Sequence, residues 1–90
     1  MKPWKITWAG QTFTGDDLIA SDLIDLQLLL GDGWRSCDPW AGPLHLVAQI
    51  AVYTARTIGT DLDVVREQLK AVPAKELLAA LDVAVDLKAA

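Results

Sequence analysis

The sequence predicts a mainly α fold: a small helical domain of about four helices over residues 15–90, preceded by a short β-hairpin over residues 4–14. Two observations lead to this prediction. Residues alternate between apolar and polar at the start of the chain, and apolar residues then recur every three or four positions. The chain has 90 residues, 52% of them hydrophobic, which suits a single domain with its own core and excludes the composition of a disordered protein.

The hairpin is predicted from the segment WKITW, residues 4–8. Its alternation places three large side chains on one face: Trp4, Ile6 and Trp8. Residues 9–10, Ala-Gly, can turn the chain, and QTFT at 11–14 can return antiparallel with Phe13 on the same apolar face. Because an isolated two-stranded hairpin is only marginally stable, we expect it to lie on the helices.

The first helical segments are predicted from capping residues. Thr14 and Asp17 have the spacing of a capping box, which favours a short helical turn directly after the hairpin. Ser21 is a candidate N-cap for the next helix, whose apolar face widens over residues 23–30. Gly31 is expected to end this helix, as glycine commonly does at the position after the last helical residue.

The most apolar segment is predicted to be the central helix. Pro43 suits the first position of a helix, and residues 44–58 are apolar on most faces, which is typical of a helix surrounded by its neighbours. Gly59 is expected to end it.

Two further helices are expected after the central one. Thr60 and Asp63 form another capping-box pair, and one apolar stripe runs from Leu62 to Val72. Pro73 is expected to interrupt the helix. Residues 77–87 then carry leucine and valine among charged residues, which predicts a final amphipathic helix.

The stretch GDGWRSCDPWAGPLHL, residues 31–46, holds the only cysteine and the only histidine, Cys37 and His45. With Asp38 they supply at most three zinc ligands, whereas a structural zinc site uses four. Neither a calcium loop nor a phosphate-binding loop matches this stretch. A catalytic dyad of Cys37 and His45 lacks a recognisable group to orient the imidazole. We therefore expect no catalytic residue, no metal and no cofactor, and a small hydrolase using this dyad is an alternative.

The tryptophans of this stretch allow two interpretations. Turn dipeptides, Asp38-Pro39 and Gly42-Pro43, make the connector rigid, and its tryptophans can seal the ends of helices. In that case we expect Trp34 to pack near Leu46 or Ile50. Alternatively, exposed tryptophans form a patch that binds a partner. The candidate partner-binding residues are Trp4, Trp8, Trp34, Trp40 and Asp38.

The charge pattern argues against nucleic acid as a partner. The net charge is −4, and the stretch from Asp16 to Asp38 holds six carboxylates and one arginine. Nucleic-acid binders need a positive surface to replace the counterions of phosphates. The acidic stretch is either a solvated surface or a patch that meets a basic partner.

No apolar run reaches the ~18 residues of a membrane span, and no secretion signal is recognisable, so we expect a cytoplasmic protein without a membrane partner.

The order of motifs resembles the short tail assembly chaperones of long-tailed phages (siphophages) that infect actinobacteria. The similarity covers nearly the whole chain. It rests on the WxIxWxGxxF pattern of the hairpin, on GDGW at 31–34, on DPWAGPLHLVAQIAVYTARTIG at 38–59 and on VPAKELLAAL at 72–81.

The resemblance implies a non-enzymatic role. Such proteins coat the tape measure protein while tail tube subunits polymerise around it, keep its apolar helical segments in solution, and leave before the virion is complete. It implies the tape measure and tail tube proteins as partners, possible self-association, and a location in the host cytoplasm rather than in the mature virion. The family also makes a longer form by frameshifting, and we expect this chain to correspond to the short form.

Two other classes of function stay open beside this one and the hydrolase. A small regulatory or immunity-type protein that binds a single folded partner would have a closed polar surface and one-to-one stoichiometry. Binding to a membrane surface is a further alternative, but such binders favour lysine and arginine on the polar face, and the last predicted helix is mostly acidic there.

Overall fold

The computed structural model describes residues 4–32 and 38–83 of the chain. Within them the elements follow in the order β1 (Trp4–Trp8), β2 (Gln11–Thr14), η1 (Gly15–Asp17), α1 (Ala20–Leu30), η3 (Pro39–Ala41), α2 (Pro43–Ile58), α3 (Leu62–Lys70), α4 (Ala74–Ala79) and β3 (Leu81–Val83), where η denotes a 3₁₀ turn. Four α-helices and an N-terminal antiparallel hairpin in this part of the chain confirm the predicted fold class.

The hairpin forms as the alternation predicts. Strands β1 and β2 pair antiparallel with Trp8 opposite Gln11, which leaves Ala9 and Gly10 as a two-residue loop. Both loop residues have positive φ angles, 51° and 80°, as a type I′ hairpin turn requires. Ile6 and its partner on β2, Phe13, are almost completely buried, so the apolar face of the hairpin lies on the core.

The C-terminal segment differs from the prediction. The expected amphipathic helix ends with α4, and the chain continues as β3, which pairs antiparallel with β1 to give the strand order β2-β1-β3. The free edge of β1 explains the change. Its unpaired backbone N–H and C=O groups can form hydrogen bonds with a strand, whereas the backbone groups of a helix already bond to one another. The N–H of Thr7 donates to the carbonyl of Ala80 at 2.9 Å, and Leu81 lies opposite Ile6. Residues from 84 onward, which the prediction assigned to the same helix, lie outside the described part.

Helix α1 begins one residue before the predicted cap. The chain enters the helix after Ile19, and the Asp22 carboxylate accepts the Ile19 backbone N–H at 2.9 Å. The N-cap position predicted for Ser21 is therefore occupied by Ile19, and the capping side chain is that of Asp22, the third residue of the helix. The helix ends at Gly31, as predicted, with a φ of 59° that favours glycine.

Helix α3 also begins at a different cap. Gly59 adopts a left-handed conformation and ends α2, as predicted, and the N–H of Thr60 then donates to the carbonyl of Ala55 at 3.0 Å. Because Thr60 belongs to the end of α2, the side chain of Asp61 caps α3 instead, accepting the N–H of Asp63 at 2.8 Å. The predicted capping box of Thr14 and Asp17, by contrast, is present before η1.

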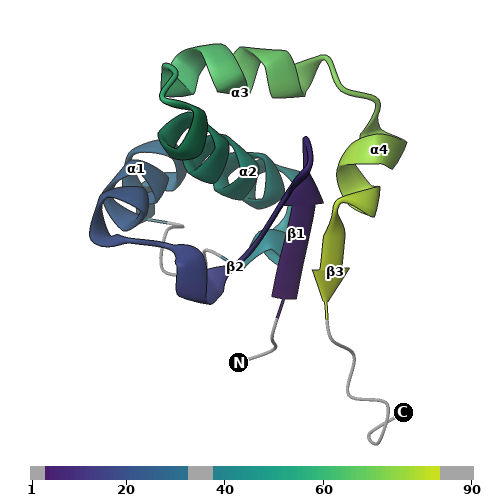
Figure 1. Cartoon of the computed structure of the whole chain (residues 1–90), viewed down its shortest axis with the longest axis horizontal. Helices are drawn as coiled ribbons and strands as arrows, with labels where there is room; N and C mark the ends of the chain where they lie inside the picture. Colours follow the sequence, from purple (N-terminus) through teal and green to yellow (C-terminus); the bar gives the residue numbers. More distant parts are fainter. Residues whose placement is uncertain (1–3, 33–37, 84–90) are drawn as a thin grey trace, which may run out of the picture.

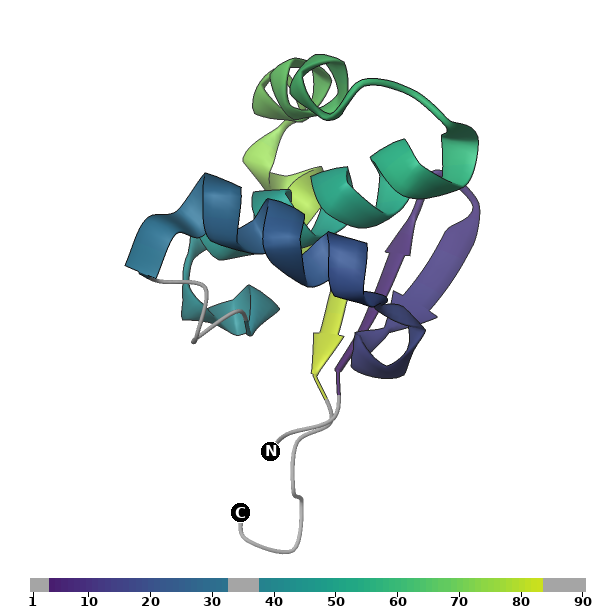
Figure 2. The same cartoon turned by 90° about the vertical axis from the view of Figure 1, so that its left-hand side faces the viewer.

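Helix α2 is the centre of the fold, as its composition predicts. Figures 1 and 2 show the sheet on one side of α2, α1 on another side, and α3 crossing over it. The main core cluster joins α2 to the sheet, α3 and α4 through Ile6, Phe13, Leu46, Ile50, Ala51, Ala55, Val65, Leu69, Leu77 and Ala80. A second cluster, formed by Leu26, Ala48 and Val52, joins α2 to α1.

A buried ion pair joins α1 to the end of α2. The Asp22 side chain is 1% exposed, and the Arg56 Nε donates to its two carboxylate oxygens at 2.9 and 3.1 Å. The same guanidinium donates through Nη2 to the backbone carbonyl of Asp17 at 3.0 Å and lies 5.2 Å from the centre of the Tyr53 ring. The Tyr53 ring in turn stacks on Phe13, with centroids 4.0 Å apart, so the pair is also connected to the hairpin.

Replacing Arg56 with Met should lower the free energy of unfolding by about 2–3 kcal/mol, because the change leaves a buried carboxylate without its cation. This loss is smaller than the loss expected for breaking a fully buried pair, because Arg56 is partly exposed. Arg66→Met is the matched control. Arg66 is 33% exposed, like Arg56 at 32%, but its partner Asp63 is 83% exposed. Its removal should cost less than about 0.5 kcal/mol. Urea denaturation measures both, and equal losses would contradict the importance of the buried pair.

The strand assignment of β3 is tested at Asp82, which is exposed and lies opposite Lys5 on β1. In a strand, Asp82→Thr should be more stable than Asp82→Ala by a few tenths to about 1 kcal/mol, because β-branched residues favour the pleated backbone. In a helix the order would reverse, since alanine has the higher helix propensity. Thermal or urea unfolding of the two variants decides between the two structures.

Candidate interaction surface

The two tryptophans of β1 lie at the edge of the core. Trp4 and Trp8 are half-buried and pack against the main cluster. The Trp4 ring meets Phe13 edge-on, with centroids 5.8 Å apart, and a Cβ atom at Gly15 would lie 3.4 Å from the same ring. Both tryptophans therefore contribute to packing, and only part of each ring is left for a partner.

The other predicted partner-binding residues come from the connector. Trp40 is half-buried in η3, a turn that packs against α2 and β3. Asp38 precedes this turn, and its backbone carbonyl accepts the N–H of Ala41 at 3.0 Å. Trp34 lies outside the described residues, as does its predicted contact with α2. The β1 tryptophans and Trp40 thus belong to different elements, and their role in binding stays a prediction.

The Cys37–His45 dyad of the hydrolase alternative is only partly placed by the structure. His45 lies in the first turn of α2, as predicted, but Cys37 is outside the described residues. The Nδ1 atom of His45 is buried and has no hydrogen-bond partner in the described part of the chain, so no carboxylate there orients the imidazole through this atom. Residues 4–32 and 38–83 also contain no group of three His, Cys, Asp or Glu side chains that could hold a metal ion.

The clearest candidate surface is the side of α1 that faces away from α2. At 100° per residue, six exposed residues of this helix fall on one continuous arc. We call this arc the outer face of α1; it consists of Ala20, Ser21, Leu23, Ile24, Gln27 and Leu28. It carries no charge, and three of its side chains are large, apolar and well exposed: Leu23 at 41%, Ile24 at 60% and Leu28 at 77%.

No described element covers the outer face of α1. Figure 2 shows α1 in front of α2, with its far side turned to the viewer. The opposite side of the helix carries Asp22 and Leu26, which are buried, and Leu26 packs on Ala48 and Val52 of α2. Soluble surface helices usually have charged or polar residues opposite their buried stripe. A contiguous apolar surface in that position is typical of a site that meets another molecule.

The sequence predicts the helix and its wide apolar face but not the exposure of that face. A signal was present in the composition of residues 20–30. Their leucines and isoleucine are distributed around the whole helix rather than along one stripe. A single neighbouring helix can cover only one side of such a segment, so some of these side chains had to face outward or meet a partner.

In comparisons with known proteins, no family model, no curated protein and no solved structure matched the chain. Among the helices in the described ranges, none has the length and apolar character needed to cross a membrane.

The exposure of the outer face is tested by a pair of neighbouring leucines. Leu28→Ala should change the free energy of unfolding by less than about 0.5 kcal/mol, because Leu28 is 77% exposed and alanine preserves the helix. Leu26→Ala, two positions away, should cost about 2–5 kcal/mol because Leu26 is completely buried. Urea denaturation of both variants provides the measurement. A large loss for Leu28→Ala would mean that a segment of the protein covers this face.

Proposed function

We propose that the chain is a non-enzymatic tail assembly chaperone of a siphophage, which binds the tape measure protein and tail tube subunits and keeps the tape measure in solution while the tail is built. The observation that carries the proposal is the outer face of α1, an uncharged apolar surface on the side of the helix that would ordinarily be polar. The resemblance of the sequence motifs to this family of chaperones supports it.

The geometry suits the task of masking apolar helices. A tape measure protein presents long helical segments whose apolar sides associate with one another unless another surface covers them. The outer face of α1 offers side chains at positions 24 and 28, one helical turn apart, with Leu23 beside them. Such spacing matches the recurrence of apolar residues on a second helix, which is how amphipathic helices are recognised by apolar surfaces.

The exposed face also favours the chaperone over a regulatory or immunity-type protein. The latter would bind one folded partner through a surface that is polar in the free monomer, because the monomer has to persist alone. A protein whose surface helix exposes Leu23, Ile24 and Leu28 is better suited to bind apolar segments that are themselves prone to aggregate.

Co-expression with the tape measure protein of the same phage tests the proposal. We expect the tape measure to stay in the supernatant with this chain and to precipitate without it. Size-exclusion chromatography with light scattering should show several copies of the chain on each tape measure molecule. An unrelated acidic helical protein of similar size is the control. A compact monomer that leaves the tape measure insoluble would refute the proposal and favour the single-partner regulatory role.

A further inference from the structure

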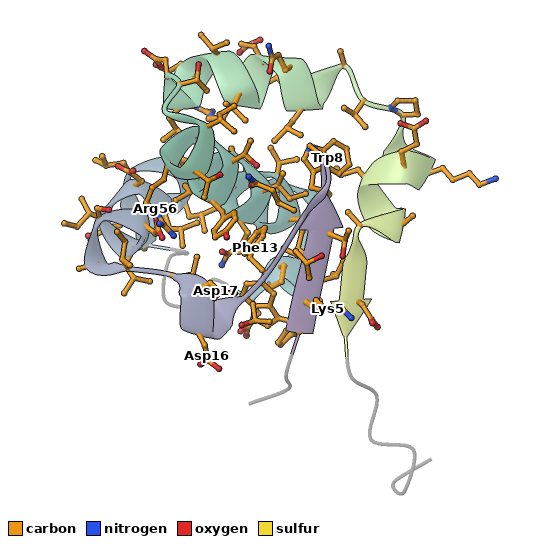
Figure 3. The ribbon with its side chains drawn as sticks, viewed as in Figure 1. Lys5, Trp8, Phe13, Asp16, Asp17 and Arg56 are labelled. Carbon is orange, nitrogen blue, oxygen red and sulfur yellow. The ribbon has the colours of Figure 1, made fainter. Side chains whose placement is uncertain are left out.

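Four carboxylates that are not buried lie on α1 or close to its two ends in the sequence, and one of them, Asp17, also accepts the Thr14 N–H in the cap of η1. Two of them, Asp16 and Asp17, lie in η1 just before the helix and are exposed, and Figure 3 shows Asp16 pointing away from the body of the protein. Asp25 lies on the helix three positions from Leu28, and Asp32 is exposed just beyond the helix end. We call these four residues the acidic rim: Asp16, Asp17, Asp25 and Asp32.

The acidic rim is not neutralised by the described part of the chain. The ion pairs within the described residues join Arg56 to Asp22, Arg66 to Asp63, and Lys70 to Glu67, and none of them includes a residue of the acidic rim. Arg56, the basic residue that reaches α1, is already engaged by the buried Asp22 and by the backbone carbonyl of Asp17. From residue 6 to residue 32 the sequence contains no lysine or arginine. Within residues 4–32 and 38–83, the apolar surface of α1 therefore has carboxylates beside it that no described cation pairs with.

We propose that the outer face of α1 is a docking surface for an amphipathic helix whose apolar stripe is flanked by lysine and arginine. The inference rests on the proposed function in taking the partner to be a helical segment. The stripe would cover Leu23, Ile24 and Leu28, and the flanking cations would meet the acidic rim. Complementary charge at the edge of an interface fixes orientation and speeds association, while the apolar centre supplies most of the affinity.

A second copy of the chain is a poorer occupant than a basic helix. The chain has a net charge of −4, and a two-fold symmetric contact through α1 would bring one acidic rim against another. The basic residues of α3, Arg66 and Lys70, are already paired with acidic neighbours on the same helix. A lipid surface is also a poor occupant, because helices that lie on membranes carry lysine and arginine beside their apolar face.

The decisive experiment uses two synthetic helical peptides with the same leucine stripe, one flanked by lysines and the other by glutamates. Fluorescence anisotropy at low salt should show that the lysine peptide binds the full chain and the glutamate peptide does not. Leu28→Glu should weaken binding of the lysine peptide at least about tenfold, as expected for the loss of a central apolar contact. Leu78→Glu on α4 is the matched control, since Leu78 is also well exposed, at 62%, and should bind like the parent.

The acidic rim is tested in the same assay. Replacing Asp25 and Asp32 together with asparagine should weaken binding of the lysine peptide about three- to tenfold and reduce its dependence on salt. The control replaces two exposed carboxylates elsewhere, Glu76→Gln with Asp82→Asn, and should have little effect. Equal binding of the two peptides, or equal losses in test and control variants, would overturn the inference. The inference would also be overturned if the chain formed a dimer or bound to lipid vesicles and Leu28→Glu abolished that association.

Co-expression with the tape measure protein separates this inference from the proposed function. If the tape measure stays soluble with the parent chain and equally with Leu28→Glu, the chaperone stands and the docking surface is wrong. If the lysine peptide binds at α1 but the tape measure is never held in solution, the docking surface stands and the partner is another basic helix.

Discussion

The arrangement of the helices depends on one ion pair. Asp22 is buried, and a buried carboxylate destabilises a protein unless hydrogen bonds and a cation compensate for lost hydration. Here Arg56 supplies two hydrogen bonds and the Ile19 N–H a third. Because Arg56 also donates to the carbonyl of Asp17, the pair holds together the turn after the hairpin, the start of α1 and the end of α2. Further along the contact between α1 and α2, Leu26 packs on the small side chains of α2.

The same pair determines which side of α1 faces outward. Residues 22 and 26 are one turn apart, so fixing Asp22 against Arg56 also directs Leu26 toward α2. Leu28 then has to lie on the far side of the helix, and Ile24 lies beside it. Turning these apolar side chains inward would expose Leu26 and separate the buried carboxylate from its cation. The exposed apolar face is therefore imposed by the rest of the fold rather than being an incidental feature of a loosely packed helix.

Elements with local signals could be predicted from the sequence, whereas those that depend on distant partners could not. The alternation in β1, the Ala-Gly turn and the glycine after α2 act within a few residues, and each prediction was confirmed. Strand β3 has only three residues, and what makes it a strand is the free edge of β1, more than seventy positions away in the sequence. Arg56 and Asp22 are likewise 34 residues apart. The outer face of α1 was missed for a related reason: periodicity cannot tell which side of a helix is covered when apolar residues surround it.

The size of the outer face of α1 suggests how the proposed chaperone would work. Helix α1 has 11 residues and is therefore roughly 16 Å long and, with side chains, about 10 Å wide. A face of these dimensions has an area far below the ~800 Å² that each partner buries in a typical stable complex, so one copy could hold a helical segment only weakly. Many copies along one long chain gain strength if they also contact each other or a shared partner, because each further contact forms at high effective concentration. On the proposed function, weak individual contacts would also allow each copy to be displaced when tube subunits arrive. On the proposed function, a small docking face is therefore an advantage, since a chaperone that bound tightly at each site could not leave the completed tail.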